Sequence, residues 1–147
     1  MADIARNRQA GYKYNLLEKW EAGLQLQGSE VKSLRNGGVQ LKDAFATVSN
    51  GEVWLHNMHI APYAPASREN HEPERSRKLL LHKGEIERLI GRTAEKGLTL
   101  IPTRLYWKNG RAKVEIALAS GKNVQDKRRY LKEKDARREI QQALQDR

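Results

Sequence analysis

The sequence predicts a mainly β fold, a small antiparallel β-barrel with two or three packed helices and a basic C-terminal tail. Two Asn-Gly dipeptides, Asn50-Gly51 and Asn109-Gly110, each separate two apolar-rich runs. Asn and Gly tolerate the positive φ that both central positions of a type I′ hairpin require. Two such hairpins among several short runs indicate an antiparallel architecture, although periodicity alone leaves a sandwich open as the alternative to a barrel.

Alternating apolar and polar residues place particular side chains on the outside of this sheet. Within residues 20–27 the apolar side chains fall on the even positions, which directs Glu21 outward. Residues 112–118 alternate in the same way, which directs Lys113 and Glu115 outward.

Two further segments carry helix signals. In GSEVKSLRNGG, Ser29 is the candidate N-cap and Gly37 the stop. Residues 86–94 carry apolar side chains at helical spacing, and Gly97 follows them. Between these segments, residues 61–76 are rich in Pro, Ser, Asn and charge and predict an exposed loop.

The chain of 147 residues is expected to form one domain over residues 1–120 and a basic tail over residues 121–147. Residues 122–134 offer little apolar surface to bury. Beyond them, Ala136, Ile140, Ala143 and Leu144 share one helical stripe. We therefore expect the tail to be disordered alone and helical when docked on a partner.

Composition favours a polyanionic partner. The 28 Lys and Arg against 18 Asp and Glu give a net charge of +10, which indicates nucleic acid rather than a surface that is basic only for solubility. The absence of cysteine excludes a disulfide framework and fits a reducing compartment, so we expect a cytoplasmic location. No apolar run is long enough to span a membrane, and the N-terminus lacks the apolar region of a secretion signal.

Patterns that carry catalysis or bind metals do not occur in the sequence. His56 and His59 would lie on opposite faces of a strand-like run, with no acidic ligand at metal-site spacing. No GxxxxGK[ST] phosphate loop is present, and acids such as Asp43 and Glu115 are readable as ordinary surface residues. We predict no enzymatic activity, no metal and no cofactor.

Nucleic-acid binding agrees better with the residues present. Tyr12, Tyr14, Tyr106 and Trp107 would stack on exposed bases if they face outward, with core or sheet packing as the favoured alternative for any one of them. An outward Glu21 would repel phosphate, but its carboxylate can accept hydrogen bonds from base edges or 2′-hydroxyls, which favours a structured RNA. The candidate phosphate contacts are Arg6, Arg8, Lys32, Arg35, Arg75, Arg77, Lys78, Lys113 and the basic run 127–129.

Several blocks of the sequence resemble the SsrA-binding protein family, also called small protein B. They are ARNRQAGYKY, EAGLQLQGSEVKSLRNGG, RSRKLLLHKGEIERL, KGLTLIPTRLYWKNGRAKVEIALASGK and DKRR, in this order and over most of the chain. The resemblance implies an oligonucleotide-binding-like antiparallel barrel with helices packed around it. It also implies that the body clasps the tRNA-like domain of transfer-messenger RNA and escorts it to stalled ribosomes for trans-translation.

The same resemblance implies the partners and the site. The partners would be transfer-messenger RNA, the ribosome at its small-subunit decoding centre and message path, and indirectly alanyl-tRNA synthetase and elongation factor Tu, for a monomeric protein. Family positions that touch RNA correspond here to Glu21, Leu80, His82, Lys113, Lys127 and Arg128. The tail would engage the ribosome through Tyr130, Lys132, Lys134, Arg137, Arg138, Ile140 and Leu144. Two alternatives stay open: a general structured-RNA-binding or ribosome-assembly protein, and an RNA-processing enzyme.

Overall fold

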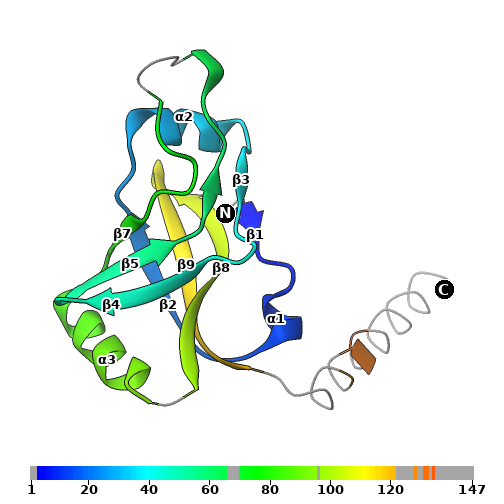
Figure 1. Ribbon diagram of the computed structural model, residues 1–147, viewed down its shortest axis with the longest axis vertical. Helices are drawn as coiled ribbons and strands as arrows, with labels where there is room; N and C mark the ends of the chain where they lie inside the picture. The colour runs from blue at the N-terminus through cyan, green and yellow to red at the C-terminus, as the bar shows by residue number, and fades with distance from the viewer. Residues whose placement is uncertain are drawn as a thin grey trace.

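Antiparallel strands close into a barrel in the computed structural model, which describes residues 3–65, 70–95 and 97–121, together with residues 128, 131, 132 and 134 (Figure 1). The strands are β1 (Asp3–Arg6), β2 (Tyr14–Leu24), β3 (Val39–Gln40), β4 (Phe45–Ser49), β5 (Glu52–His56), β6 (His59–Ile60), β7 (Arg77–Leu80), β8 (Leu98–Lys108) and β9 (Arg111–Gly121). The helices are α1 (Ala10–Lys13), α2 (Gly28–Arg35) and α3 (Lys83–Thr93).

The sheet order shows how the barrel closes. The strands follow one another as β1-β8-β4-β5-β7-β2-β9, and β9 pairs again with β8. The strands from β8 round to β9 therefore form a closed ring, and β1 is added to β8 outside it. Strands β3 and β6 form a separate small sheet. The predicted mainly β barrel is confirmed.

Both Asn-Gly dipeptides form the hairpin turns that the sequence predicts. Asn50 and Gly51 have φ of 53° and 74°, and Asn109 and Gly110 have 52° and 75°. Positive φ at both central residues matches the twist of the flanking strands. The turns join β4 to β5 and β8 to β9, with Ser49 opposite Glu52 and Lys108 opposite Arg111.

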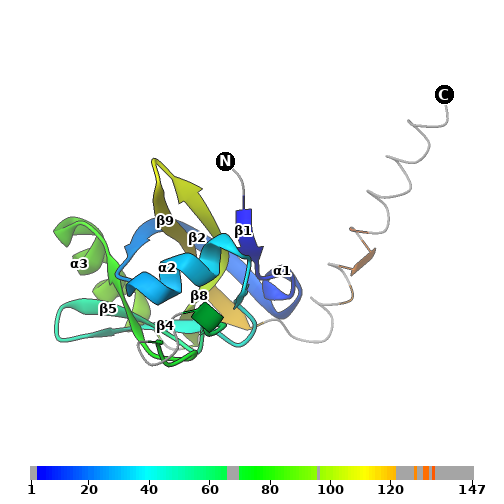
Figure 2. The ribbon, with the colours of Figure 1, turned by 90° about the horizontal axis from the view of Figure 1, so that it is seen from above.

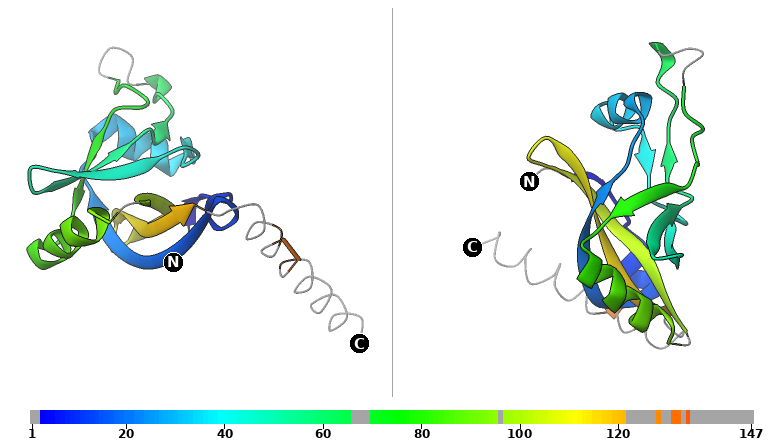
Figure 3. Two further views of the ribbon diagram at one scale, coloured as in Figure 1. Left: turned by 60° about the horizontal axis from the view of Figure 1, so that its bottom comes forward. Right: turned by 90° about the vertical axis from the view of Figure 1, so that its left-hand side faces the viewer.

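The helices lie around the outside of the barrel (Figure 2), and α2 and α3 lie at opposite ends of it (Figure 1). The hairpin of β4 and β5 lies across the barrel from β2 and β9 (Figure 3). The inward side chains of β2, β5, β8 and β9 fill the interior; those with no exposed surface include Val53, Leu55, Leu105, Val114, Ile116 and Leu118. Leu89 adds the apolar face of α3 to this core. Alternation along β9 is therefore as predicted.

The N-terminus of α2 differs from the prediction. Gln27, not Ser29, is the N-cap, and the Glu30 carboxylate accepts a hydrogen bond from the Gln27 backbone N–H at 2.8 Å. The Ser29 hydroxyl is instead 2.9 Å from Nδ1 of the buried His71. The helix ends as expected, because Gly37 follows it with φ of 74°.

Residues 61–76 are not simply an exposed loop in their described part. His71 is only 5% exposed and lies between Ser29 and the carbonyl of Ile60, 2.9 Å from its Nε2. Arg77, at the start of β7, is fully buried and donates to the Glu30 carboxylate and to the carbonyls of Met58 and Pro73. Polar side chains thus fix this segment onto α2.

The buried pair of Glu30 and Arg77 is an ionised one. Burial by itself would raise the pKa of Glu30, but hydrogen bonds from Arg75, the backbone N–H of Gln27 and Arg77 hold that pKa below its ordinary value. Both side chains have 0% exposure, so Arg77 cannot be the phosphate contact that its place in a basic run suggested. No helix in the described part of the chain is long and apolar enough to cross a membrane.

Candidate nucleic-acid interface

The outer face of β2, β9 and β8 brings several predicted RNA contacts together. Gly23 stands opposite Lys113, and Lys113 stands opposite Tyr106 on the next strand. Residues opposite each other in a ladder present their side chains on the same face. Glu21, two residues before Gly23, therefore shares that face, as the alternation of the sequence predicts.

Glu21 is held by two neighbours on β8. Tyr106 donates its hydroxyl proton to Oε2 of Glu21, and Nζ of Lys108 lies 3.1 Å from Oε1 and 3.4 Å from Oε2. The bond from Tyr106, followed by the one from Lys108, lowers the pKa of Glu21 below its ordinary value, and the charge of Lys113 acts in the same direction. The carboxylate is ionised at neutral pH, partly exposed, and oriented from one side.

Tyr106 is a support of this face rather than a stacking platform. The residue is 2% exposed, so the condition for stacking, a ring that faces outward, is not met, and Tyr106 takes the alternative role of packing in the sheet. Its ring is covered by the guanidinium of Arg104, 4.5 Å from the ring centroid. Burial, together with the hydrogen bond to Glu21, raises the pKa of Tyr106 to about 12. The hydroxyl therefore remains a proton donor throughout the physiological range.

Lys113 and Leu80 meet over the backbone of Gly23. Leu80 pairs with Gly23 in the β2–β7 ladder and is 51% exposed. A Cβ placed on Gly23 would lie 3.2 Å from Cβ of Leu80 and 3.5 Å from Nζ of Lys113. The absence of a side chain at Gly23 lets the leucine and the ammonium come together. They border a pocket of about 240 Å³ that Trp107 and Arg111 also line.

A second set of charges fixes the adjacent part of the same face. Nε of Arg104 donates to Glu115 at 2.8 Å and its Nη1 to Asp3 at 3.2 Å. Nζ of Lys19 lies 3.2 Å from the other oxygen of Glu115. The hydrogen bond to Glu115 raises the pKa of Arg104, so this cation is permanent. Arg104 is thereby immobilised over the ring of Tyr106.

The remaining predicted contacts lie at the edge of this face or outside the described residues. His82 is exposed two residues beyond Leu80 and is the N-cap of α3, where its backbone N–H donates to Glu85 at 3.2 Å. In the tail, Arg128, Lys132 and Lys134 are exposed and helical. The other predicted contacts lie outside the described residues: Lys127, Tyr130, Arg137, Arg138, Ile140 and Leu144.

The two histidines of HNMH take up separate structural roles. Nε2 of His56 is 2.8 Å from the Thr47 hydroxyl and its Nδ1 is 2.8 Å from the Ser76 hydroxyl. His59 lies 3.7 Å from the Glu74 carboxylate. Within the part of the chain that the structure describes, no group of three or more His, Cys, Asp or Glu is placed to hold a metal ion.

Comparison with known proteins decides the family. The family model described as "SmpB protein" matches residues 4–146. The chain belongs to the SmpB family. It is 57% identical over 141 residues to the SsrA-binding protein of Carboxydothermus hydrogenoformans, covering 96% of this chain and 95% of the relative. It is 58% identical over 144 residues to the SsrA-binding protein of Bacillus cytotoxicus, covering 98% and 93%.

A solved member of the SmpB family has the same fold. The structure described as "tmRNA-SmpB: a journey to the center of the bacterial ribosome" superposes with a TM-score of 0.70 at 46% identity. The match covers 88% of this chain and 95% of that one. The resemblance inferred from the sequence blocks is thereby confirmed.

Sequence reasoning did not find the residues that support Glu21. Tyr106 and Lys108 lie 85 and 87 positions from it along the chain. The period of β8 would have placed both on the outer face with Arg104, but only the barrel closure through β9 brings them to Glu21. The sequence signal that could have helped is the Asn109-Gly110 turn. This turn places Lys108 opposite Arg111 and so brings β8 next to β9.

Proposed function

We propose that the chain binds the tRNA-like domain of transfer-messenger RNA and delivers it to stalled ribosomes for trans-translation. The observation that carries the proposal is the shared outer face of Glu21, Leu80 and Lys113 in a member of the SmpB family. Relatives are named SsrA-binding proteins, and the structural neighbour is described together with tmRNA and the bacterial ribosome.

The face offers three kinds of contact to RNA. The Glu21 carboxylate accepts hydrogen bonds from 2′-hydroxyls or base amino groups, whereas a phosphate has no proton to donate to it. The ammonium group of Lys113 forms no hydrogen bond or ion pair with any described residue and is available to a phosphate. Leu80 presents apolar surface to a ribose or a base face. This face thus combines an acceptor, a cation and an apolar contact at fixed spacing. Such a combination selects a structured RNA and not polyanions in general.

The mechanism is recognition followed by delivery, with no covalent step. The protein acts as an adaptor rather than an enzyme, as a monomer in the cytoplasm. The barrel of residues 1–120 holds the RNA, with Lys127 and Arg128 adding contacts. The tail engages the decoding centre and message path through the basic residues, Tyr130 and the apolar positions 140 and 144. Alanyl-tRNA synthetase and elongation factor Tu act on the complex through its RNA.

A binding comparison tests the proposal. Full-length protein is titrated at one salt concentration against transfer-messenger RNA and against ordinary tRNA, because affinities for nucleic acid depend on salt. Preferential binding of transfer-messenger RNA is expected, and Glu21→Gln should reduce that preference. Glu87→Gln, the same chemical change on the exposed side of α3, is the matched control. Equal affinity of the wild type for both RNAs would replace the proposal with general structured-RNA binding.

A further inference from the structure

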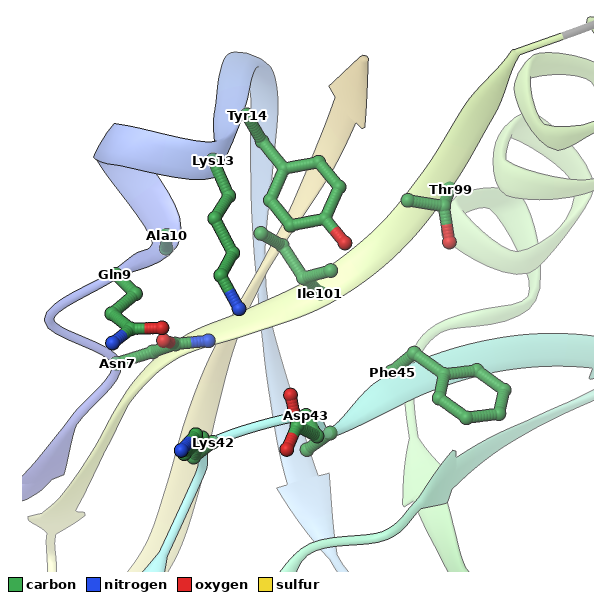
Figure 4. Close-up of a pocket in the computed structure, with 11 residues that line it drawn as sticks. Asn7, Gln9, Ala10, Lys13, Tyr14, Lys42, Asp43, Phe45, Thr99 and Ile101 are labelled. Atoms are coloured by element: carbon green, nitrogen blue, oxygen red, sulfur yellow. The ribbon is translucent and has the colours of Figure 1, made fainter. Parts of the chain in front are cut away.

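A second pocket lies far from the Glu21 face. It is lined by α1, the start of β2, the segment before β4 and the first half of β8, and it has a volume of about 270 Å³ (Figure 4). Glu21 and Tyr14 are seven residues apart along β2, so the two places are separated by roughly 20 Å at the rise of a strand. Tyr14, a candidate stacking residue from the sequence, lines this pocket, but none of the predicted phosphate contacts does.

The floor of the pocket is apolar and its wall aromatic. Ala10 and Ile101 are buried there in a small cluster outside the barrel, and Tyr14 packs against them. Phe45 also lines the pocket and is 38% exposed, with its ring centroid 5.1 Å from that of His56. Flat apolar surface of this kind suits the face of a heterocyclic base.

Cationic, anionic and hydroxyl groups surround that floor. Lys13 and the hydroxyl of Tyr14 point into the pocket from one side and the carboxylate of Asp43 from the other (Figure 4). In the described structure the side chains of Lys13, Tyr14, Lys42 and Asp43 form no hydrogen bond or ion pair, although all four line the same hollow. Asn7 is anchored differently, because its amide donates to the carbonyl of Pro102 at 3.0 Å.

The mixture of charges identifies the ligand class. An exposed carboxylate repels phosphate, so Asp43 argues against a simple anion site, while it accepts hydrogen bonds readily from exocyclic amino groups. Lys13 and Lys42 flank it and suit the phosphates on either side of a base. The volume lies below the 300–1,000 Å³ or so of pockets for drug-sized ligands, and therefore suits a single base.

We propose that this pocket binds an unpaired RNA base bearing an exocyclic amino group, with Asp43 as the residue that selects it and Lys13 and Lys42 as its phosphate contacts. The site is additional to the Glu21 face and does not depend on which RNA that face holds. It gives the barrel a second point of RNA attachment at the end where β2 begins.

The test uses the full chain and single-stranded hexanucleotides of adenine, cytosine and uracil at one ionic strength. Affinity by fluorescence anisotropy should be about fivefold or more higher for the adenine and cytosine strands than for uracil, which lacks an amino group. NMR shifts on adding the cytosine strand should concentrate in residues 9–14, 43–45 and 99–101. Equal affinities, or shifts confined to the face of Glu21 and Lys113, would overturn the proposal.

Asp43→Asn is the decisive variant. Asp43 has φ of 63°, a conformation that Asn also tolerates, so the change adds no backbone strain. An amide offers a donor as well as an acceptor, so uracil should bind nearly as well as cytosine and the preference should disappear. Glu87→Gln should leave the preference intact. If transfer-messenger RNA binds selectively while the hexanucleotides show no preference, the pocket proposal fails and the proposed function stands. If the hexanucleotides show the preference while transfer-messenger RNA and tRNA bind equally, the pocket proposal stands and the proposed function fails.

Discussion

The hydroxyl of Tyr106 donates a hydrogen bond to Oε2 of Glu21, across the intervening strand β9. The bond joins a side chain with almost no exposure to one that faces solvent. A buried donor therefore sets the orientation and charge of an exposed acceptor. This relation makes the Glu21 carboxylate a preformed contact, which loses less conformational freedom when it binds RNA.

Tyr106→Phe should release Glu21 while leaving the barrel intact. Loss of the hydrogen bond that contributes most to the low pKa of Glu21 should move this pKa up toward the ordinary 4.5, measured by NMR titration of the carboxyl carbon. Affinity for transfer-messenger RNA should fall about threefold to tenfold, because the carboxylate must be ordered on binding. Tyr63→Phe removes a hydroxyl of another half-buried tyrosine and should change neither quantity. An unaltered Glu21 pKa in Tyr106→Phe would contradict the orienting role.

Alkaline pH should destabilise the protein through the same tyrosine. The pKa of Tyr106 is raised from 10.0 to about 12, so between these values the folded state binds more protons than the unfolded state. Stability from this group is therefore complete below pH 10 and is lost as pH rises toward 12, by on the order of 2 kcal/mol. Urea denaturation at several pH values should show the loss in the wild type. The free energy of unfolding should fall less steeply with rising pH in Tyr106→Phe than in the wild type. Identical pH dependence of the two proteins would count against the raised pKa.

Local sequence signals were sufficient for the hairpins and for the outward direction of Glu21 and Lys113, because Asn-Gly chemistry and a period of two are properties of neighbouring residues. Pairings between residues far apart in the chain could not be predicted from such local signals. Arg77 stands in a run of basic residues that looked like surface, yet it is buried against Glu30, 47 positions away. The prediction of the N-cap of α2 is wrong for a related reason. The Ser29 hydroxyl interacts with His71, which belongs to another segment, instead of capping its own helix. The sequence alone does not indicate which polar groups the tertiary fold brings together.

Gly23→Ala should weaken RNA binding without unfolding the protein. The new Cβ would lie 3.2 Å from Cβ of Leu80, so Leu80 must shift by a few tenths of an ångström on the binding face, whereas 3.5 Å to Nζ of Lys113 is an ordinary contact. Gly23 does not have positive φ, so alanine brings no backbone strain. We expect a loss of affinity for transfer-messenger RNA of about tenfold at fixed salt, or about 1.4 kcal/mol. Gly91→Ala on α3, where a Cβ meets nothing within 4 Å, is the control, and equal affinities of the two variants would rule out a role for the close approach.

Glu30→Gln should be strongly destabilising. The change leaves the buried guanidinium of Arg77 without its counter-charge, which typically costs about 3–5 kcal/mol, seen as a lower urea midpoint. The double change Glu30→Gln with Arg77→Met removes the unpaired charge and should recover part of that loss. In the wild type, the lowered pKa of Glu30 means that its contribution is present above pH 4.5 and is lost as pH falls through the folded-state value. A double variant no more stable than Glu30→Gln alone would contradict the charge argument.

A chain that stops after Gly121 should separate RNA binding from delivery. Strand β9 ends at Gly121, which pairs with Tyr14, so every strand of the barrel is retained and the truncated protein should unfold cooperatively. It keeps Glu21, Leu80 and Lys113 and should bind transfer-messenger RNA with a modest loss, because Lys127 and Arg128 contribute phosphate contacts that salt weakens. Peptide tagging on stalled ribosomes should nevertheless be abolished, since the tail residues proposed to enter the message path are gone. Substituting Lys132 and Lys134 by Gln in the full chain should reduce tagging with little effect on RNA affinity, and normal tagging by the truncated chain would assign delivery to the barrel alone.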